Sequence, residues 1–211
     1  SECLGSRESP AYSEVLSALS DSYDRLIAPS IERELRSDLT DRAGEGAIVT
    51  FSDNLRNLLL QPPVRGFTVM GYDPGYRTGC KLAVVDPTGK VLDTAVIYPT
   101  KPQERIEESR RRVVSLIRRY GVGAIAIGNG TASRESEAFI ADTLREIGGG
   151  CGYVIVSEAG ASVYSASELG AEEFPDFDVT QRSAVSIARR LQDPLAELVK
   201  IDPRSDSISM I

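Results

Sequence analysis

The sequence has 211 residues, a formal net charge of −7 and no histidine. This length allows one ordinary domain and an appendage, with enough chain to bury a real core. Without histidine there is no Ser-His-Asp triad, histidine base or histidine metal ligand, so catalysis would need carboxylates, other side chains or a carboxylate-bound metal. A free-standing nucleic-acid binder is usually basic, so the acidic balance predicts that this chain alone binds nucleic acid weakly or through a local patch.

The sequence gives no sign of a membrane segment. No stretch approaches the ~18 consecutive apolar residues that a membrane helix needs. Residues 1–5 lack the basic and apolar regions of a signal peptide, so we expect a cytoplasmic protein with no membrane partner. The three cysteines, Cys3, Cys80 and Cys151, are odd in number and far apart, which favours free thiols over a disulfide framework or a zinc site.

The first part of the chain, residues 1–63, has a helical pattern. Apolar residues recur every three or four positions and form one stripe along a charged helix. Pro29 interrupts the run and Ser30 can cap a restart, which predicts a short helix and then a long one up to Leu60. The prolines after Gln61 end it. Such a stripe has to pack on the following domain or on a domain that this chain lacks.

From residue 64 to about residue 200, predicted strands alternate with predicted helices. The strands are predicted at 67–72, 81–85, 91–98, 124–127 and 153–156. One helix is predicted at about 106–120, a second follows the turn after the fourth strand and ends at 147, and two more are predicted at about 162–174 and 180–192. This order predicts an α/β fold with a mixed five-stranded sheet and flanking helices, the RNase-H-like arrangement of three antiparallel strands and two parallel additions. Residues 201–211 are predicted to be a linker or the truncated start of the next region.

Six ordered segments carry a more specific signal over about 170 residues. They are Arg25–Glu34, Asn54–Pro63, Gly71–Lys81, Ile127–Glu135, Ser157–Ser165 and Arg182–Pro194. Together they resemble the Tex family of transcription accessory proteins, over its YqgF/RuvC (RNase-H-like) domain and the helical region before it.

The resemblance implies a piece of a larger bacterial cytoplasmic protein. In that family, a helix-hairpin-helix region and an oligonucleotide-binding barrel follow this domain and bind nucleic acid. The expected function is therefore that of a nucleic-acid-associated transcription accessory factor. Its partners would be RNA or DNA, mainly through domains absent here, and the transcription machinery.

Nucleases of the RNase H class hold two divalent metals between three or four carboxylates, the first of which ends the first strand. Asp73 matches that place, although an Asp before Pro-Gly is also a common turn residue. Glu158 follows the fifth strand and can approach Asp73, because the ends of neighbouring parallel strands converge. Asp73 and Glu158 are thus the candidate catalytic and metal-binding residues, and Mg²⁺ or Mn²⁺ is the cofactor that such oxygen ligands would take. The fourth strand ends beside a neutral residue, Asn129.

The last predicted helix decides whether the metal site is complete. Active relatives place an Asp near its start, and the resemblance matches that position to Arg182, or to Ser183 if the register shifts by one. A guanidinium would repel a metal, by about 4 kcal/mol per unit charge at ~4 Å and an effective dielectric constant of 20. Asp176 and Asp178 lie close by, so a shifted ligand stays open. We expect a degenerate site and no enzymatic activity.

Two other functions remain open. One is a metal-dependent nuclease, or a hydrolase resembling Holliday-junction resolvases, that uses Asp73 and Glu158. The other is an actin-like or sugar-kinase ATPase, which would need two such domains where the chain shows one.

Candidate nucleic-acid contacts come from basic and aromatic residues. The basic candidates are Arg77, Lys81, Arg134 and Arg182. Arg134 lies at a strand-to-helix turn whose backbone amides suit a phosphate, although such a turn is also ordinary. Three tyrosines near the expected cleft can stack on bases, although tyrosines more often close a core: Tyr72, Tyr76 and Tyr164.

Overall fold

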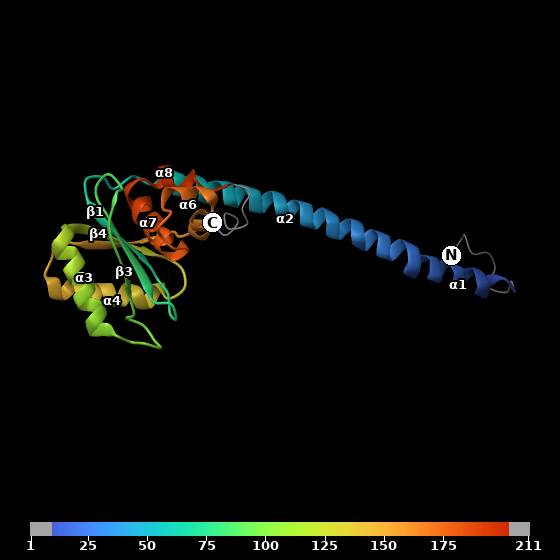
Figure 1. Ribbon diagram of the computed structural model, residues 1–211. Coiled ribbons are helices and arrows are strands. Elements are labelled where there is room, and N and C mark those ends of the chain that lie inside the picture. Colours follow the sequence, from blue (N-terminus) through green and yellow to red (C-terminus); the bar gives the residue numbers. More distant parts are fainter. Residues whose placement is uncertain (1–9, 203–211) are drawn as a thin grey trace. The chain divides into compact units, whose positions relative to one another are not determined.

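The computed structural model describes residues 10–202 (Figure 1). These residues fall into two compact units, one ending at Asp53 and the other beginning at Asn54. The first unit holds α1 (Tyr12–Ser22), the π-helical turn η2 (Tyr23–Ile27) and most of α2 (Ala28–Leu59). The part of the predicted linker (201–211) that follows Asp202 lies outside the described residues. Cys3 also lies outside them.

The predicted helix break at Pro29 is wrong. Helical structure continues from Tyr12 to Leu59, and Pro29 is the second residue of α2. Directly before it, the N–H of Ala28 donates to the carbonyl of Tyr23, five residues back. A π-helical turn widens the helix, which accommodates a proline that has no N–H and whose ring crowds the carbonyl four residues earlier. The apolar stripe of this unit is exposed, with Leu39 at 64%.

The second unit is built on a five-stranded sheet. Its strands are β1 (Thr68–Asp73), β2 (Cys80–Val85), β3 (Val91–Ile97), β4 (Val122–Gly128) and β5 (Gly152–Val156). The spatial order is β3-β2-β1-β4-β5. β2 pairs antiparallel with β1 and β3, whereas β4 pairs parallel with β1 and β5. The predicted mixed sheet with RNase-H-like order is thereby confirmed.

Six helices of the described chain follow or join these strands. They are α3 (Ile106–Tyr120), α4 (Ser133–Ile147), α5 (Ala161–Ala166), α6 (Glu168–Glu173), α7 (Val179–Gln192) and α8 (Pro194–Leu198). The single helix predicted at 162–174 is divided, because Ser167 is extended and its side chain accepts the Gly170 N–H at the start of α6. The sequence pattern did not predict α8, which Asp193 caps and Pro194 begins.

Helices cover both faces of the sheet (Figure 1). On one face, α3 and α4 bury Val113, Leu116 and Ile140 against strand residues of the first core cluster. On the other, α7 contributes a second cluster that includes Val185 and Ile187. Among the described residues, no helix is long and apolar enough to span a membrane.

The contact between α7 and the sheet is unusually close at Gly71 of β1. A Cβ at this position would lie 2.0 Å from the carbonyl oxygen of Ala184. The side chains that α7 presents here are small, and Ala184 and Ala188 are fully buried. Glycine opposite alanines therefore lets the helix backbone rest on the centre of the sheet, which places the start of α7 beside the end of β1.

Candidate functional site

The candidate site lies at the edge of the sheet where β1, β4 and β5 end. These strands run parallel, so their last residues, Asp73, Gly128 and Val156, lie at the same edge. β3 also ends there, because it is antiparallel to β2 and β2 is antiparallel to β1. Loops from four strands can thus contribute side chains to one surface, as is usual for ligand sites of α/β sheets.

Asp73 is the central carboxylate of this edge. Burial raises the pKa of Asp73 to about 6. A hydrogen bond from the Ser183 side chain and the charge of Lys81 act in the opposite direction, whereas the nearby charge of Glu158 raises the pKa further. The structure therefore brings Asp73 and Glu158 together, as the convergence of parallel strands predicts.

Glu158 occupies a notch that two glycines leave open. A Cβ at Gly130 would lie 1.6 Å from Glu158 Oε1, and a Cβ at Gly128 would lie 2.6 Å from Oε2. The backbone N–H of Glu158 donates to Asn129 Oδ1 at 3.0 Å. Burial raises the pKa of Glu158, while the Gly130 N–H and the charge of Arg190 lower it. The Gly128-Asn129-Gly130 turn thus seats the second carboxylate.

Arg190 of α7 holds the loop that carries Glu158. Its Nη1 donates to the carbonyls of Ser157 and Ala159 at 2.8 and 2.7 Å. The side chain is buried, and burial lowers the pKa of Arg190 to about 10. The sequence pattern did not predict this role, although an arginine on the apolar face of a predicted helix is a signal for a buried, structural cation.

Ser183, not Arg182, faces Asp73 from α7. The Arg182 side chain instead donates from Nε to the carbonyl of Phe174 at 3.1 Å and from Nη1 to the carbonyl of Ser165 at 3.2 Å. Of the two registers considered from the sequence, the shifted one matches the geometry. The neutral hydroxyl of Ser183 occupies the place where a carboxylate is expected in active relatives.

The nearby acidic residue Asp178 has a structural role. Its Oδ1 accepts the N–H of Gln181 at 2.8 Å, and the Gln181 side chain accepts the N–H of Asp178 at 3.0 Å, which completes a capping box. A hydrogen bond from Thr180 is the main cause that lowers the pKa of Asp178.

The residues of this edge do not fit the two-metal arrangement of RNase H-class nucleases. Within residues 10–202 no group of three or more His, Cys, Asp or Glu side chains could hold a metal ion. Asp73 and Glu158 are the two carboxylates, and the further oxygen atoms, of Ser183 and Asn129, are neutral. Two divalent cations need more negative charge and more ligands than this set offers.

The four basic candidates divide into two pairs. Lys81 is buried, and its Nζ donates to Thr78 Oγ1 at 2.6 Å and to the Thr78 and Gly79 carbonyls at 3.0 and 2.9 Å. Arg182 is engaged with backbone carbonyls as described above. Arg77 and Arg134, in contrast, are exposed, on the loop after β1 and at the start of α4.

The three tyrosines differ in the same way. Tyr72 and Tyr164 are buried, at 0% and 1% exposure, so they are core residues rather than stacking surfaces. Tyr76 is 38% exposed, and its hydroxyl donates to Glu135 Oε1 at 2.9 Å. Of these three tyrosines, only Tyr76 has an exposed ring on which a base can stack.

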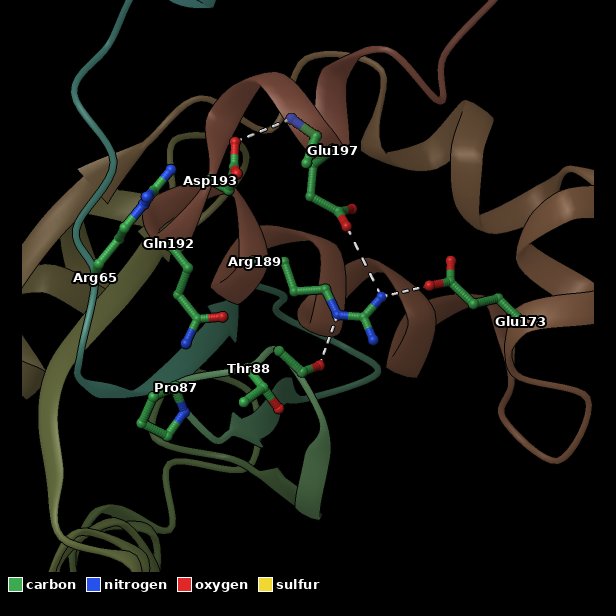
Figure 2. A pocket seen from close by; sticks show the side chains of 10 residues that line it. Arg65, Pro87, Thr88, Glu173, Arg189, Gln192, Asp193 and Glu197 are labelled. Carbon is green, nitrogen blue, oxygen red and sulfur yellow. Dashed lines mark hydrogen bonds and ion pairs between the residues drawn. The ribbon is translucent and has the colours of Figure 1, made fainter.

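A separate pocket of about 480 Å³ lies at the opposite edge of the sheet, beside the turn between β2 and β3 (Figure 2). Arg189 lies at its centre and donates to the Gly89 carbonyl at 2.8 Å and to Glu173 Oε1 at 2.5 Å. Lys200 neutralises Glu173 and the buried Glu197, at 3.1 and 2.7 Å. These charges satisfy one another, so the network ties α6, α7 and α8 to the β2–β3 turn.

Comparison with known proteins gives the family. Residues 67–192 match the family model described as the Tex protein YqgF-like domain. Among curated relatives, the chain is 63% identical over 187 residues to the uncharacterized protein YdcI of Bacillus subtilis, covering 89% of this chain and 26% of that protein. It is 52% identical to the transcriptional accessory protein Tex of Neisseria gonorrhoeae, covering 83% of this chain and 23% of that one.

A human relative extends the comparison beyond bacteria. The S1 RNA-binding domain-containing protein 1 of Homo sapiens is 47% identical over 196 residues, covering 92% of this chain and 20% of that protein. The chain spans about a quarter or less of the length of these relatives. The match over residues 67–192, together with the RNase-H-like sheet, shows that the chain belongs to the Tex family and carries its YqgF-like domain.

Proposed function

We propose that this part of the protein is a nucleic-acid-binding module of a transcription accessory factor, and that its RNase-H-like site does not cleave nucleic acid. The observation that carries the proposal is the position of Ser183. It hydrogen-bonds to Asp73 from the helix where active relatives carry an Asp, and among the described residues no third carboxylate completes a metal-binding group with Asp73 and Glu158.

The relatives support the nucleic-acid role. One is named a transcriptional accessory protein and another an RNA-binding-domain protein. Because the chain spans about a quarter or less of each, the activity of the whole protein, its place in the cytoplasm and its contacts with the transcription machinery belong to the proposal. Most of the affinity for RNA or DNA would come from regions beyond this chain.

Arg77 and Arg134 are the proposed phosphate contacts of this module. Both are exposed beside the Asp73 edge, whereas Lys81 and Arg182 are committed to protein oxygens. Since the chain carries a net charge of −7, binding through two arginines should be weak and sensitive to salt. Removing either arginine should reduce the slope of log affinity against log salt concentration by about one unit.

Fluorescence anisotropy with labelled single-stranded RNA and DNA at 25 and 150 mM salt tests the binding role. Arg134→Ala should weaken binding severalfold, and the double variant with Arg77→Ala should weaken it further. Arg118→Ala is the matched control, because Arg118 is exposed near the end of α3, close to where β4 begins and therefore away from this edge. Binding that is unchanged in the double variant would contradict this assignment of the phosphate contacts.

The alternative of a metal-dependent nuclease rests on the proximity of Asp73 and Glu158, whose pKa values burial raises. Incubation of the protein and Mn²⁺ with branched DNA, an RNA–DNA hybrid or single strands should leave all substrates intact. Cleavage that disappears in Asp73→Asn would establish the nuclease and overturn the non-catalytic proposal.

A further inference from the structure

A second pocket lies at the same edge of the sheet as Asp73. It has a volume of about 500 Å³ and is lined by the loop after β1, the loop after β3, the start of α3 and the part of α4 from Glu135 to Asp142. Tyr76 comes three residues after Asp73, and its hydrogen bond to Glu135 joins the β1 loop to the first turn of α4. The pocket is therefore continuous with the surface on which we place the nucleic-acid strand, and none of its lining residues belongs to the Asp73–Glu158 pair.

The walls of this pocket favour a flat, partly apolar ligand. Ile106, Ala138 and Phe139 line it, and Tyr76 contributes an exposed ring at its mouth. Aromatic rings and aliphatic side chains bind planar heterocycles by stacking and burial, without requiring a particular sequence. An extended aliphatic chain would leave the polar groups around this wall without partners.

The charges of the pocket exclude a phosphate and favour a ligand that donates hydrogen bonds. Three carboxylates line it, those of Glu104, Glu135 and Asp142, against two cations. Arg110 is already paired with Glu146 on α4, and Asp142 is paired with Arg145. Two lining carboxylates, those of Glu104 and Glu135, then remain against one cation, Lys101. A phosphate would meet an acidic lining, whereas the amino group of a nucleobase would meet acceptors.

A buried polar group also lacks a partner at this place. Thr100 is 8% exposed and lines the pocket, and its hydroxyl has no hydrogen-bond partner among the residues that the structure describes. Buried hydroxyls are nearly always paired, so an unpaired one on a residue that lines a pocket is a candidate partner for a ligand atom. A hydroxyl can both donate to a ring nitrogen and accept from an amino group, which suits a base edge.

Two exposed arginines are chain neighbours of residues that line the pocket. Arg77 follows Tyr76 in the chain, and Arg134 precedes Glu135, and both arginines are exposed. The lining is thus acceptor-rich inside and cationic at its border. This is the charge distribution expected where a backbone passes outside and a base turns inward.

We propose that this pocket receives one unstacked, amino-bearing nucleobase of a single strand, which stacks on Tyr76 and reaches Thr100 while its phosphates contact Arg77 and Arg134. The inference rests on the proposed nucleic-acid function and adds the recognised chemical group: a base such as adenine or cytosine. The backbone of the nucleic-acid strand binds at the edge of the sheet, and the pocket selects a strand that carries such a base.

A comparison of two strands of equal length and charge tests this proposal. One is a 12-nucleotide oligo(dA), and the other is an abasic deoxyribose-phosphate strand. The 211-residue chain at low salt should bind oligo(dA) roughly 10-fold more tightly than the abasic strand, the order expected from one stacked base. A thymine strand, whose base lacks an amino group, should show a smaller preference over the abasic strand than oligo(dA) does.

Variants of the pocket should remove this preference and leave binding of the abasic strand unchanged. Ala138→Trp fills the pocket without a change of charge, and exposed Ala166 on α5 provides the matched control Ala166→Trp. Tyr76→Ala, at an exposed position, gives the same information should the tryptophan at position 138 disturb folding. Thr100→Val keeps the shape of the side chain and should reduce the preference about threefold to tenfold.

The outcomes separate the two proposals. If wild type binds neither strand, the proposed nucleic-acid function fails. If it binds both strands equally, the function stands and the base pocket is wrong. If the preference for oligo(dA) survives in both Ala138→Trp and Tyr76→Ala, the base is recognised elsewhere and the inference is overturned.

Discussion

The hydroxyl of Ser183 hydrogen-bonds to the carboxylate of Asp73, across the contact between α7 and the end of β1. This bond lowers the pKa of a carboxylate that burial otherwise raises. Serine compensates part of the desolvation of Asp73 without adding a negative charge. Serine therefore takes the place of a third negatively charged ligand, and this relationship leads to the first prediction.

Substitution of Ser183 by aspartate should create a divalent-metal site. Ser183→Asp would place a third carboxylate beside Asp73 and Glu158, and one added charge near a cation is worth several kcal/mol at about 4 Å in a medium of intermediate dielectric constant. Isothermal titration calorimetry with Mn²⁺ should show an affinity at least about tenfold above wild type. Ser183→Asn is the neutral control, and equal Mn²⁺ affinities for the three proteins would contradict the prediction.

Removal of the Asp73 charge should stabilise the protein at neutral pH. The pKa of Asp73 is about 6 in the folded chain against an ordinary value of 3.8, so the folded state holds the proton more tightly than the unfolded state. The ionised carboxylate therefore costs stability above pH 6, by about 1–3 kcal/mol after allowance for partial exposure. This cost disappears as the pH falls from 6 to about 4, because Asp73 then becomes protonated in the folded state.

Urea denaturation of wild type and Asp73→Asn at pH 7.5 and pH 4.5 measures this linkage. The variant should be more stable by about 1–3 kcal/mol at the higher pH and by about a third of that amount at the lower pH. The difference between the two proteins cancels the contribution of acidic groups that do not interact with Asp73. A variant less stable than wild type at pH 7.5 would show that Asp73 has favourable partners that outweigh its burial.

Arg190→Met should destabilise the loop that carries Glu158. The variant removes both hydrogen bonds to the carbonyls of Ser157 and Ala159 and leaves these half-buried acceptors without the arginine. The expected loss is about 3 kcal/mol of unfolding free energy, measured by urea denaturation. Arg118→Met is the control, since Arg118 is exposed on α3 and its loss should change stability by less than about 0.5 kcal/mol. A stability equal to that of the control would contradict the holding role of Arg190.

Gly71→Ala should separate α7 from the sheet. The added Cβ would lie 2.0 Å from the Ala184 carbonyl oxygen, a backbone atom that cannot move without the helix. We expect a loss of about 3 kcal/mol or more, seen as a lower Tm in circular dichroism. Gly152→Ala in β5 is the matched control, because no atom lies within 4 Å of its added Cβ. Equal Tm values for the two variants would show that α7 shifts at little cost.

The fold was largely predictable because its signals are local. Short apolar runs between turn residues indicated each strand, as at Lys81–Val85, and the helices followed from periodicity. The exceptions have local physical reasons as well. The turn before Pro29 absorbs the proline by widening, and Ser167 caps a new helix inside a continuous apolar pattern. Neither the widened turn nor the new helix cap changes the spacing of the apolar residues, so the sequence pattern does not reveal them.

By itself, the sequence determined the order of strands and helices, the family resemblance and the proximity of Asp73 to Glu158, because parallel strands share an edge. Only the tertiary structure decided which residue of α7 faces Asp73. A one-residue shift turns a helix by about 100°, and the seating of α7 on Gly71 sets that rotation. It directs Ser183 toward the carboxylate and Arg182 toward backbone carbonyls. Burial likewise separated Lys81 from Arg77 and Tyr72 from Tyr76, since exposure depends on packing between distant segments.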